Sequence, residues 1–130
     1  MATERTQAQT KAHLAHIVDL IHRLRAAQDA GDEAAEDAAR AEIEDLPLEV
    51  LVRFGWRRPD EDVGPPEEYQ ITLATDGPEV RITGALDRWG CPISAVLQHT
   101  NWDKPWMTYP ADAEEEQALL EFARQFYYWG

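Results

Sequence analysis

The sequence predicts an α+β fold with an N-terminal helical hairpin, an antiparallel β-meander of about four strands and a C-terminal helix packed on the sheet. Apolar residues recur at three- and four-residue steps near both ends of the chain, which is the period of amphipathic helices. Between residues 48 and 100 they alternate with polar residues, which is the period of half-buried strands. Short turn signals join these strands and favour antiparallel neighbours.

The length of 130 residues predicts a single domain, because single domains commonly span about 100–150 residues. Residues 1–46 are predicted to form an acidic helical hairpin, and residues 47–130 the antiparallel sheet plus the C-terminal helix. The first residues lack the apolar stretch of a secretory signal, and the chain contains no run of 18 apolar residues. Cys91 is the only cysteine, so a cytoplasmic, reducing location is expected.

The helical hairpin is predicted from two helices that a break at residues 29–32 separates. The first, about residues 10–28, has an apolar stripe. This stripe consists of Leu14, Ile17, Val18, Ile21 and Leu24. In the break, Gly31 suits a left-handed C-terminal cap and Asp32 an N-cap. The second helix, about residues 33–45, is rich in alanine and has Ile43 as its one large apolar residue, so it should pack closely and shallowly.

Acidic residues dominate the second helix and the turn before it. Between residues 29 and 45, eight acids stand against the single Arg40. They are Asp29, Asp32, Glu33, Glu36, Asp37, Glu42, Glu44 and Asp45. Such a run is commonly a solvated helix face. Alternatively, spaced carboxylates imitate the phosphates of a nucleic acid and occupy a basic groove on a protein partner. All of them except Asp45 are candidate partner-binding residues.

The predicted sheet begins after Pro47, which ends the second helix. Residues 48–56 carry an apolar side chain at every even position and are expected to form a half-buried strand. Residues 57–68, with three prolines and five acids, are expected to form a surface loop. Alternating segments at about 69–73, 80–86 and 93–100 predict the remaining strands.

The C-terminal helix is predicted to begin after Pro110, with Asp112 as its N-cap. Glutamates at 114–116 lie at the positive end of the helix dipole. The buried stripe is expected to contain Leu119, Phe122, Ala123 and Phe126. Together with the first helix, this helix should cover one face of the sheet.

No enzymatic activity, cofactor or metal site is predicted. His13, His16 and His22 lie on different faces of one helix, because each i+3 step rotates by about 60°, so they offer at most two ligands to one metal. Cys91 and His99 would lie about 26 Å apart on a straight strand, too far for a nucleophile and its base. Phosphate-binding, dinucleotide-binding and serine-nucleophile motifs are not found in the sequence.

The charge of the chain limits its partners. Twenty-five acids against 12 lysines and arginines give a formal net charge of -13, which argues against direct binding of nucleic acid or of an anionic membrane. Aromatic residues offer a second candidate surface in the loop around Pro105, where Trp102 and Trp106 lie. They could anchor a protein interface. They could also fold back to cover the edge of the core.

Two motifs carry a family resemblance. Thr-x-Gly-Pro at residues 75–78 and Trp-x-x-Pro-Trp at residues 102–106, together with the ending at residues 119–128, resemble a family of small acidic proteins of phages, plasmids and integrative elements. The likeness covers about residues 46–130 and leaves out the helical hairpin. The resemblance implies a context, because small acidic proteins of mobile elements often inhibit host defence, as anti-CRISPR and anti-restriction proteins do.

These observations lead to one leading hypothesis and one alternative. The leading hypothesis is a non-enzymatic inhibitor of a prokaryotic defence complex, such as a CRISPR effector or a restriction complex, in the cytoplasm of the host cell. It would bind a basic nucleic-acid-binding groove of this protein partner through its acidic surface. The alternative is an accessory protein-interaction module that uses the Trp102/Trp106 loop, with acidity serving only solubility.

Overall fold

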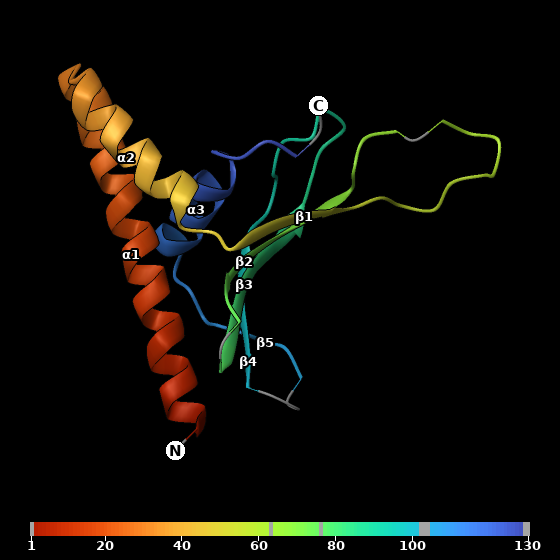
Figure 1. The fold of residues 1–130 in the computed structure, drawn as a ribbon, viewed down its shortest axis with the longest axis horizontal. Coiled ribbons are helices and arrows are strands. Elements are labelled where there is room, and N and C mark those ends of the chain that lie inside the picture. Colours follow the sequence, from red (N-terminus) through yellow and green to blue (C-terminus); the bar gives the residue numbers. More distant parts are fainter. Residues whose placement is uncertain (1, 63, 76, 102–104, 129–130) are drawn as a thin grey trace.

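The computed structural model confirms the α+β fold, with a helix pair, one antiparallel sheet and a C-terminal helix packed on the sheet (Figure 1). It describes residues 2–62, 64–75, 77–101 and 105–128, with side chains from residue 5 onward. The helices are α1 (Ala2–Ala30), α2 (Glu33–Asp45) and α3 (Ala113–Ala123). The strands are β1 (Glu49–Arg53), β2 (Glu68–Ala74), β3 (Pro78–Ala85), β4 (Val96–Asn101) and β5 (Met107–Thr108).

The turn between α1 and α2 has the predicted caps. Gly31 adopts a φ of 67°, in the left-handed region that glycine tolerates best. The side chain of Asp32 accepts a hydrogen bond from the backbone N–H of Ala35 at 3.1 Å. On α2 only Ala39 and Ile43 are buried, so the second helix packs shallowly on α1, as predicted.

The five strands lie in chain order, β1-β2-β3-β4-β5, and each neighbouring pair is antiparallel. The register places Ile71 opposite Val50 and Ile82, and Ile82 opposite Leu97. These residues share one face because successive side chains on a strand alternate between faces. That face supplies the sheet's half of the core.

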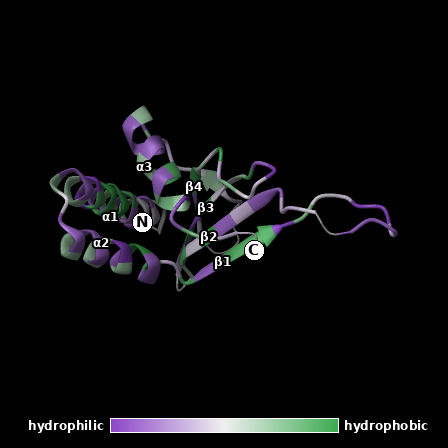
Figure 2. Cartoon of the chain, turned by 90° about the horizontal axis from the view of Figure 1, so that it is seen from above, coloured by the Kyte–Doolittle hydropathy of each residue, from purple (hydrophilic) through white to green (hydrophobic). Residues whose placement is uncertain are grey.

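All three helices lie on one side of the sheet (Figure 2). α1 packs mainly on β3 and β4, and α3 packs against α1 and β4. Ile17, Leu20, Ile71, Ile82 and Phe122 are fully buried between these layers. The opposite face of the sheet, which we call the open face, has no described helix over it.

The strand predicted at residues 48–56 is shorter and more exposed than expected. It ends at Arg53, and residues 54–62 and 64–67 belong to an arm that projects from the sheet (Figure 1). Val52, Phe54 and Trp56 are 37%, 43% and 101% exposed. The prediction of a half-buried strand was therefore wrong for these positions. The strand ends at Arg53 and α1 packs on β3 and β4, so of the β1 residues only Val50 packs against the core.

Other boundaries also differ from the predictions. α1 begins about two turns earlier, through a polar segment in which the hydroxyl of Thr10 donates to the carbonyl oxygen of Thr6 at 2.7 Å. β4 begins at Val96 rather than near residue 93, because Ser94 does not form the regular hydrogen bonds of a strand. The hydroxyl oxygen of Ser94 accepts a hydrogen bond from the backbone N–H of Ala85, and its carbonyl oxygen accepts one from the hydroxyl of Tyr69. The two-residue strand β5 was not predicted, since two residues show no period.

Candidate interaction surfaces

Three residues of the acidic run share one exposed side of α2. Glu33, Asp37 and Glu44 are spaced by four and seven residues, which places them on one side of a helix with 3.6 residues per turn. Ala39 and Ile43, the buried residues, lie elsewhere around the helix, on the side that packs on α1. We call the three acids the outer face of α2. All three side chains are exposed, and none forms an ion pair with another described residue.

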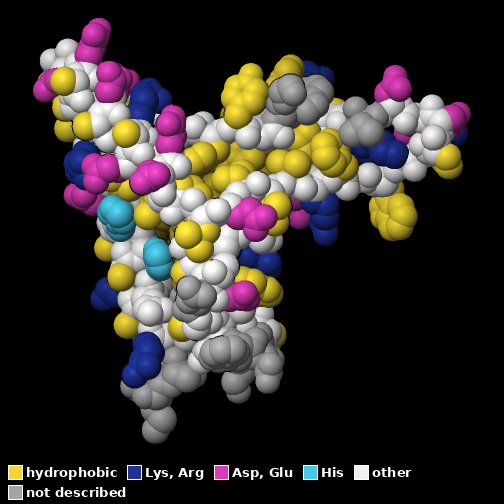
Figure 3. Space-filling view, viewed as in Figure 1, with side chains coloured by type: hydrophobic (Ala, Val, Ile, Leu, Met, Phe, Trp, Pro, Cys, Tyr) yellow, Lys and Arg dark blue, Asp and Glu magenta, His cyan; other side chains and the backbone are white. Residues whose placement is uncertain are grey.

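Three of the other acidic candidates bind groups within the chain. Asp32 caps α2. Glu36 accepts a hydrogen bond from Arg40 at 3.0 Å, and Arg40 holds the pKa of the Glu36 carboxyl below its ordinary value. Glu42 pairs with Arg23 of α1, and this hydrogen bond raises the pKa of the Arg23 guanidinium. Asp29 is exposed in the last turn of α1. The structure therefore brings three of the seven predicted acids onto one side of α2. Acidic side chains gather at the hairpin end, where α2 begins (Figure 3).

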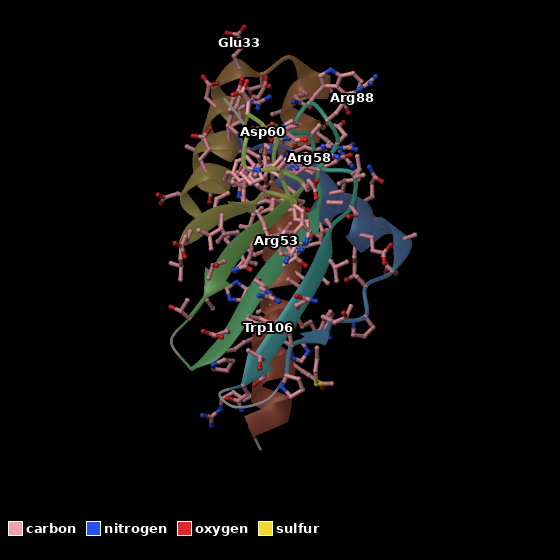
Figure 4. The ribbon with its side chains drawn as sticks, turned by 90° about the vertical axis from the view of Figure 1, so that its right-hand side faces the viewer. Glu33, Arg53, Arg58, Asp60, Arg88 and Trp106 are labelled. Carbon is pink, nitrogen blue, oxygen red and sulfur yellow. The ribbon has the colours of Figure 1, made fainter. Side chains whose placement is uncertain are left out.

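The aromatic candidates lie elsewhere. Trp102 is outside the described residues. Trp106 is 36% exposed, and its ring centroid lies 3.7 Å from the guanidinium carbon of Arg81 on the open face. Figure 4 places Glu33 and Trp106 at opposite ends of the molecule. The acidic and aromatic candidates therefore form two separate surfaces.

The open face has a hollow with a volume of about 570 Å³, which was not predicted from the sequence. Side chains from four neighbouring strands meet there (Figure 4). Its lining residues are Leu51, Val52, Arg53, Glu68, Tyr69, Gln70, Arg81, Thr83 and Gln98. The signal in the sequence was weak, because the polar positions of an alternating strand look like ordinary solvent-facing residues.

Arg81 is fixed at the centre of this open face. Its Nε–H donates to the side-chain oxygen of Gln98 at 2.9 Å, and a second N–H donates to that of Gln70 at 3.1 Å. Burial lowers the pKa of Arg81, against the opposing effect of Glu79. No carboxylate among the described residues lies within ion-pair distance of its guanidinium. The arrangement holds a planar cation on a polar sheet face.

Outside these surfaces, two described histidines have lowered pKa values. His99 is buried, which lowers its pKa, and its ring lies 6.3 Å from that of Tyr109. Burial, and to a lesser degree His16, lowers the pKa of His13. Across the described ranges, no three His, Cys, Asp or Glu residues cluster so that they could hold a metal ion. Cys91 is an exposed free thiol.

Comparison with protein-family models, with curated proteins and with solved structures finds no match to this chain. Among the helices of the described residues, none combines the length and the apolar character needed to cross a membrane.

Proposed function

We propose that this protein is a non-enzymatic inhibitor of a prokaryotic defence complex, of the anti-CRISPR or anti-restriction type. It binds a basic nucleic-acid-binding groove of its protein partner through the outer face of α2. Glu33, Asp37 and Glu44 supply the charges that imitate phosphates. The family resemblance of residues 46–130 supports the mobile-element context, and the net charge of -13 supports attraction to a basic partner.

The observation that carries this proposal is that the outer-face acids are not neutralised by ion pairs with described residues of the same chain. The carboxylates of Glu36 and Glu42, on the flanks of the packing side, form ion pairs with arginines of the same chain. Glu33, Asp37 and Glu44 form none with described residues, and the burial of α2 depends on only two residues. Their mutual repulsion is a cost that binding to a cationic surface would remove.

The test is inhibition in cells. We expect the wild-type protein to raise phage plating on a host whose CRISPR or restriction system is active. The triple variant Glu33→Lys, Asp37→Lys, Glu44→Lys should lose this effect, because it reverses the outer face without touching the pair between Glu36 and Arg40.

A matched control has the same change in net charge at three exposed acids elsewhere. These are Asp60, Asp62 and Glu116, each changed to Lys. The control should inhibit like the wild-type protein. Equal inhibition by the outer-face variant would remove the acidic mechanism, and no effect of the wild-type protein on any such system would remove the proposed function.

A second candidate function is an accessory interaction module that uses the open face. It is favoured by the position of Trp106, a half-exposed aromatic ring stacked under a fixed arginine. Aromatic and arginine side chains are the residues that most often anchor protein interfaces. In this case the change of Trp106 to Ala, and not the change of the outer face, should abolish binding.

A further inference from the structure

β1 is an edge strand whose outer side is free. It pairs with β2 on one side only, and no described strand pairs with its other side. In Figure 2, β1 lies at the outer edge of the sheet. An uncovered edge strand presents backbone N–H and C=O groups to which a further strand can add.

Exposed apolar side chains concentrate on and beside this strand. Five of the 11 large hydrophobic residues that are exposed in the described chain lie within residues 48–56. They are Leu48, Leu51, Val52, Phe54 and Trp56. Natural proteins usually blunt an edge with charges, prolines or bulges, and exposed apolar side chains along a free edge favour pairing with another strand.

The sequence of β1 is complementary to itself in the antiparallel direction. Leu51 is the centre, and its two neighbours are both valines, Val50 and Val52. One step further, Glu49 lies on one side and Arg53 on the other. When two copies of the strand pair antiparallel about Leu51, each glutamate therefore lies opposite an arginine.

The faces of the strand agree with this register. Glu49, Leu51 and Arg53 point to the open face, and Val50 and Val52 to the face that carries the helices, because side chains alternate. Self-pairing then places valine opposite valine on one face. On the other it places leucine opposite leucine between two pairs of opposite charge, an arrangement that stabilises antiparallel neighbours.

We propose that the partner of β1 is β1 of a second copy of this chain, paired antiparallel about a twofold axis at Leu51. The two five-stranded sheets then form one continuous sheet, with the helices of both copies on the same side. Continuing the register places Leu48 of one copy opposite Phe54 of the other. Arg53 lies between its own Glu68, with which it already pairs, and Glu49 of the second copy.

The geometry also limits the assembly to a dimer. The opposite edge of the sheet is β5, which has only two residues and offers a poor template for further pairing. The twofold interface uses the same strand of both copies, so it leaves no second free β1 edge. The inference does not depend on the proposed function, because it does not use the outer face of α2.

The test is the oligomeric state of the purified full chain, measured by sedimentation from about 1 μM to about 100 μM. We expect a species of twice the monomer mass of 14.8 kDa that dissociates on dilution. Leu51→Lys places two lysines against each other at the axis. Glu49→Arg places arginine opposite Arg53, and Arg53→Glu places glutamate opposite Glu49. Each variant should weaken association by about tenfold or more and keep the circular dichroism spectrum of the wild type.

The sharper result comes from mixing the two charge variants. Glu49→Arg has two arginines on β1 and Arg53→Glu has two glutamates, so neither pairs with itself but each complements the other. We expect the equimolar mixture to form a heterodimer. A wild-type protein that stays monomeric over the whole range would overturn the proposal. So would a dimer that Leu51→Lys and the single charge variants leave unchanged, or a mixture that stays monomeric.

Discussion

Arg25 of α1 and Glu121 of α3 form an ion pair that joins residues 96 positions apart. Nε of Arg25 donates to one carboxylate oxygen of Glu121 at 2.9 Å, and a second N–H of the same guanidinium donates to the other oxygen. This two-point contact fixes the C-terminal helix against the first helix. It therefore sets how α3 lies over β4, with which it also packs.

The ion pair should give the protein an acid-sensitive part of its stability. The hydrogen bond from Arg25 holds the pKa of Glu121 below its ordinary value of 4.5. The stabilisation is complete above that value and is lost as the pH falls through the lower pKa of the folded state. Because both side chains are partly exposed, we expect Glu121→Gln to lower the free energy of unfolding by about 0.5–1 kcal/mol at pH 7.

Urea unfolding from pH 7 down to about pH 3 checks this prediction, because the difference from wild type should shrink towards the acid end. Arg25→Gln should cause a similar loss at pH 7. The double variant should then lose less than the sum of the two single losses. Fully additive losses would mean that the two side chains do not interact.

Gly84 is expected to be the glycine least tolerant of substitution among those described. A Cβ at this position would lie 2.0 Å from the carbonyl oxygen of Ser94 and 2.7 Å from the Tyr69 ring. We expect Gly84→Ala to lower the free energy of unfolding by about 2–4 kcal/mol in urea titrations. Gly55→Ala is the matched control. There the nearest atoms belong to the exposed side chain of Glu67, which can move aside, so the change should stay below about 1 kcal/mol.

Two buried phenols should tie the C-terminal segment to the sheet. The hydroxyl of Tyr128 donates to the carbonyl oxygen of Ala123 at 2.6 Å, and its ring lies 5.0 Å from that of Tyr69. We expect Tyr128→Phe to lower the free energy of unfolding by about 1–1.5 kcal/mol near pH 7, because a buried carbonyl loses its donor.

Burial raises the pKa of both Tyr69 and Tyr128 above the ordinary value of 10. The folded state therefore keeps the phenols protonated where the unfolded chain ionises, and their stabilisation is complete below pH 10 and lost as the pH rises above it. Thermal unfolding at rising pH should show the wild type and Tyr128→Phe converging above about pH 10. A difference that stays constant would contradict the raised pKa.

Trp106 should matter little for folding. Arg81 keeps its hydrogen bonds to Gln70 and Gln98 when the ring is removed, so Trp106→Ala should lower the free energy of unfolding by only about 0.5–1 kcal/mol. Trp56→Ala, at a fully exposed ring, should leave the unfolding midpoint unchanged. A global loss of structure in Trp106→Ala would show that the ring is part of the core rather than of a binding surface.

Local signals in the sequence predicted the elements well. The structure confirms the left-handed Gly31, the N-caps Asp32 and Asp112, and the buried stripe through Leu119 and Phe122. At Asp112 the side chain and that of Glu115 each accept a hydrogen bond from the other's backbone, which completes a capping box. Such features depend on residues a few positions apart, so their chemistry is visible in the chain itself.

The candidate surfaces were harder to predict because they depend on distant segments. Glu36 and Glu42 form ion pairs within the chain and Glu33 does not, and this difference depends on where α2 packs. Alternation predicted a half-buried strand over residues 48–56, but it could not show that the helices pack mainly near β3 and β4 and leave most of this edge exposed. The hollow beside Arg81 likewise required the register of four strands.

The chain-order arrangement of the sheet has a consequence for synthesis. Each strand after the first pairs with the strand made just before it, so every hairpin can close as soon as its second strand leaves the ribosome. The contacts of α1 with β4 and with α3 are the exceptions, because they span most of the chain. We therefore expect that the strands of the nascent chain pair first and that the core stays open to water until Leu119 and Phe122 leave the ribosome. Packing of α3 would then be the last step of folding.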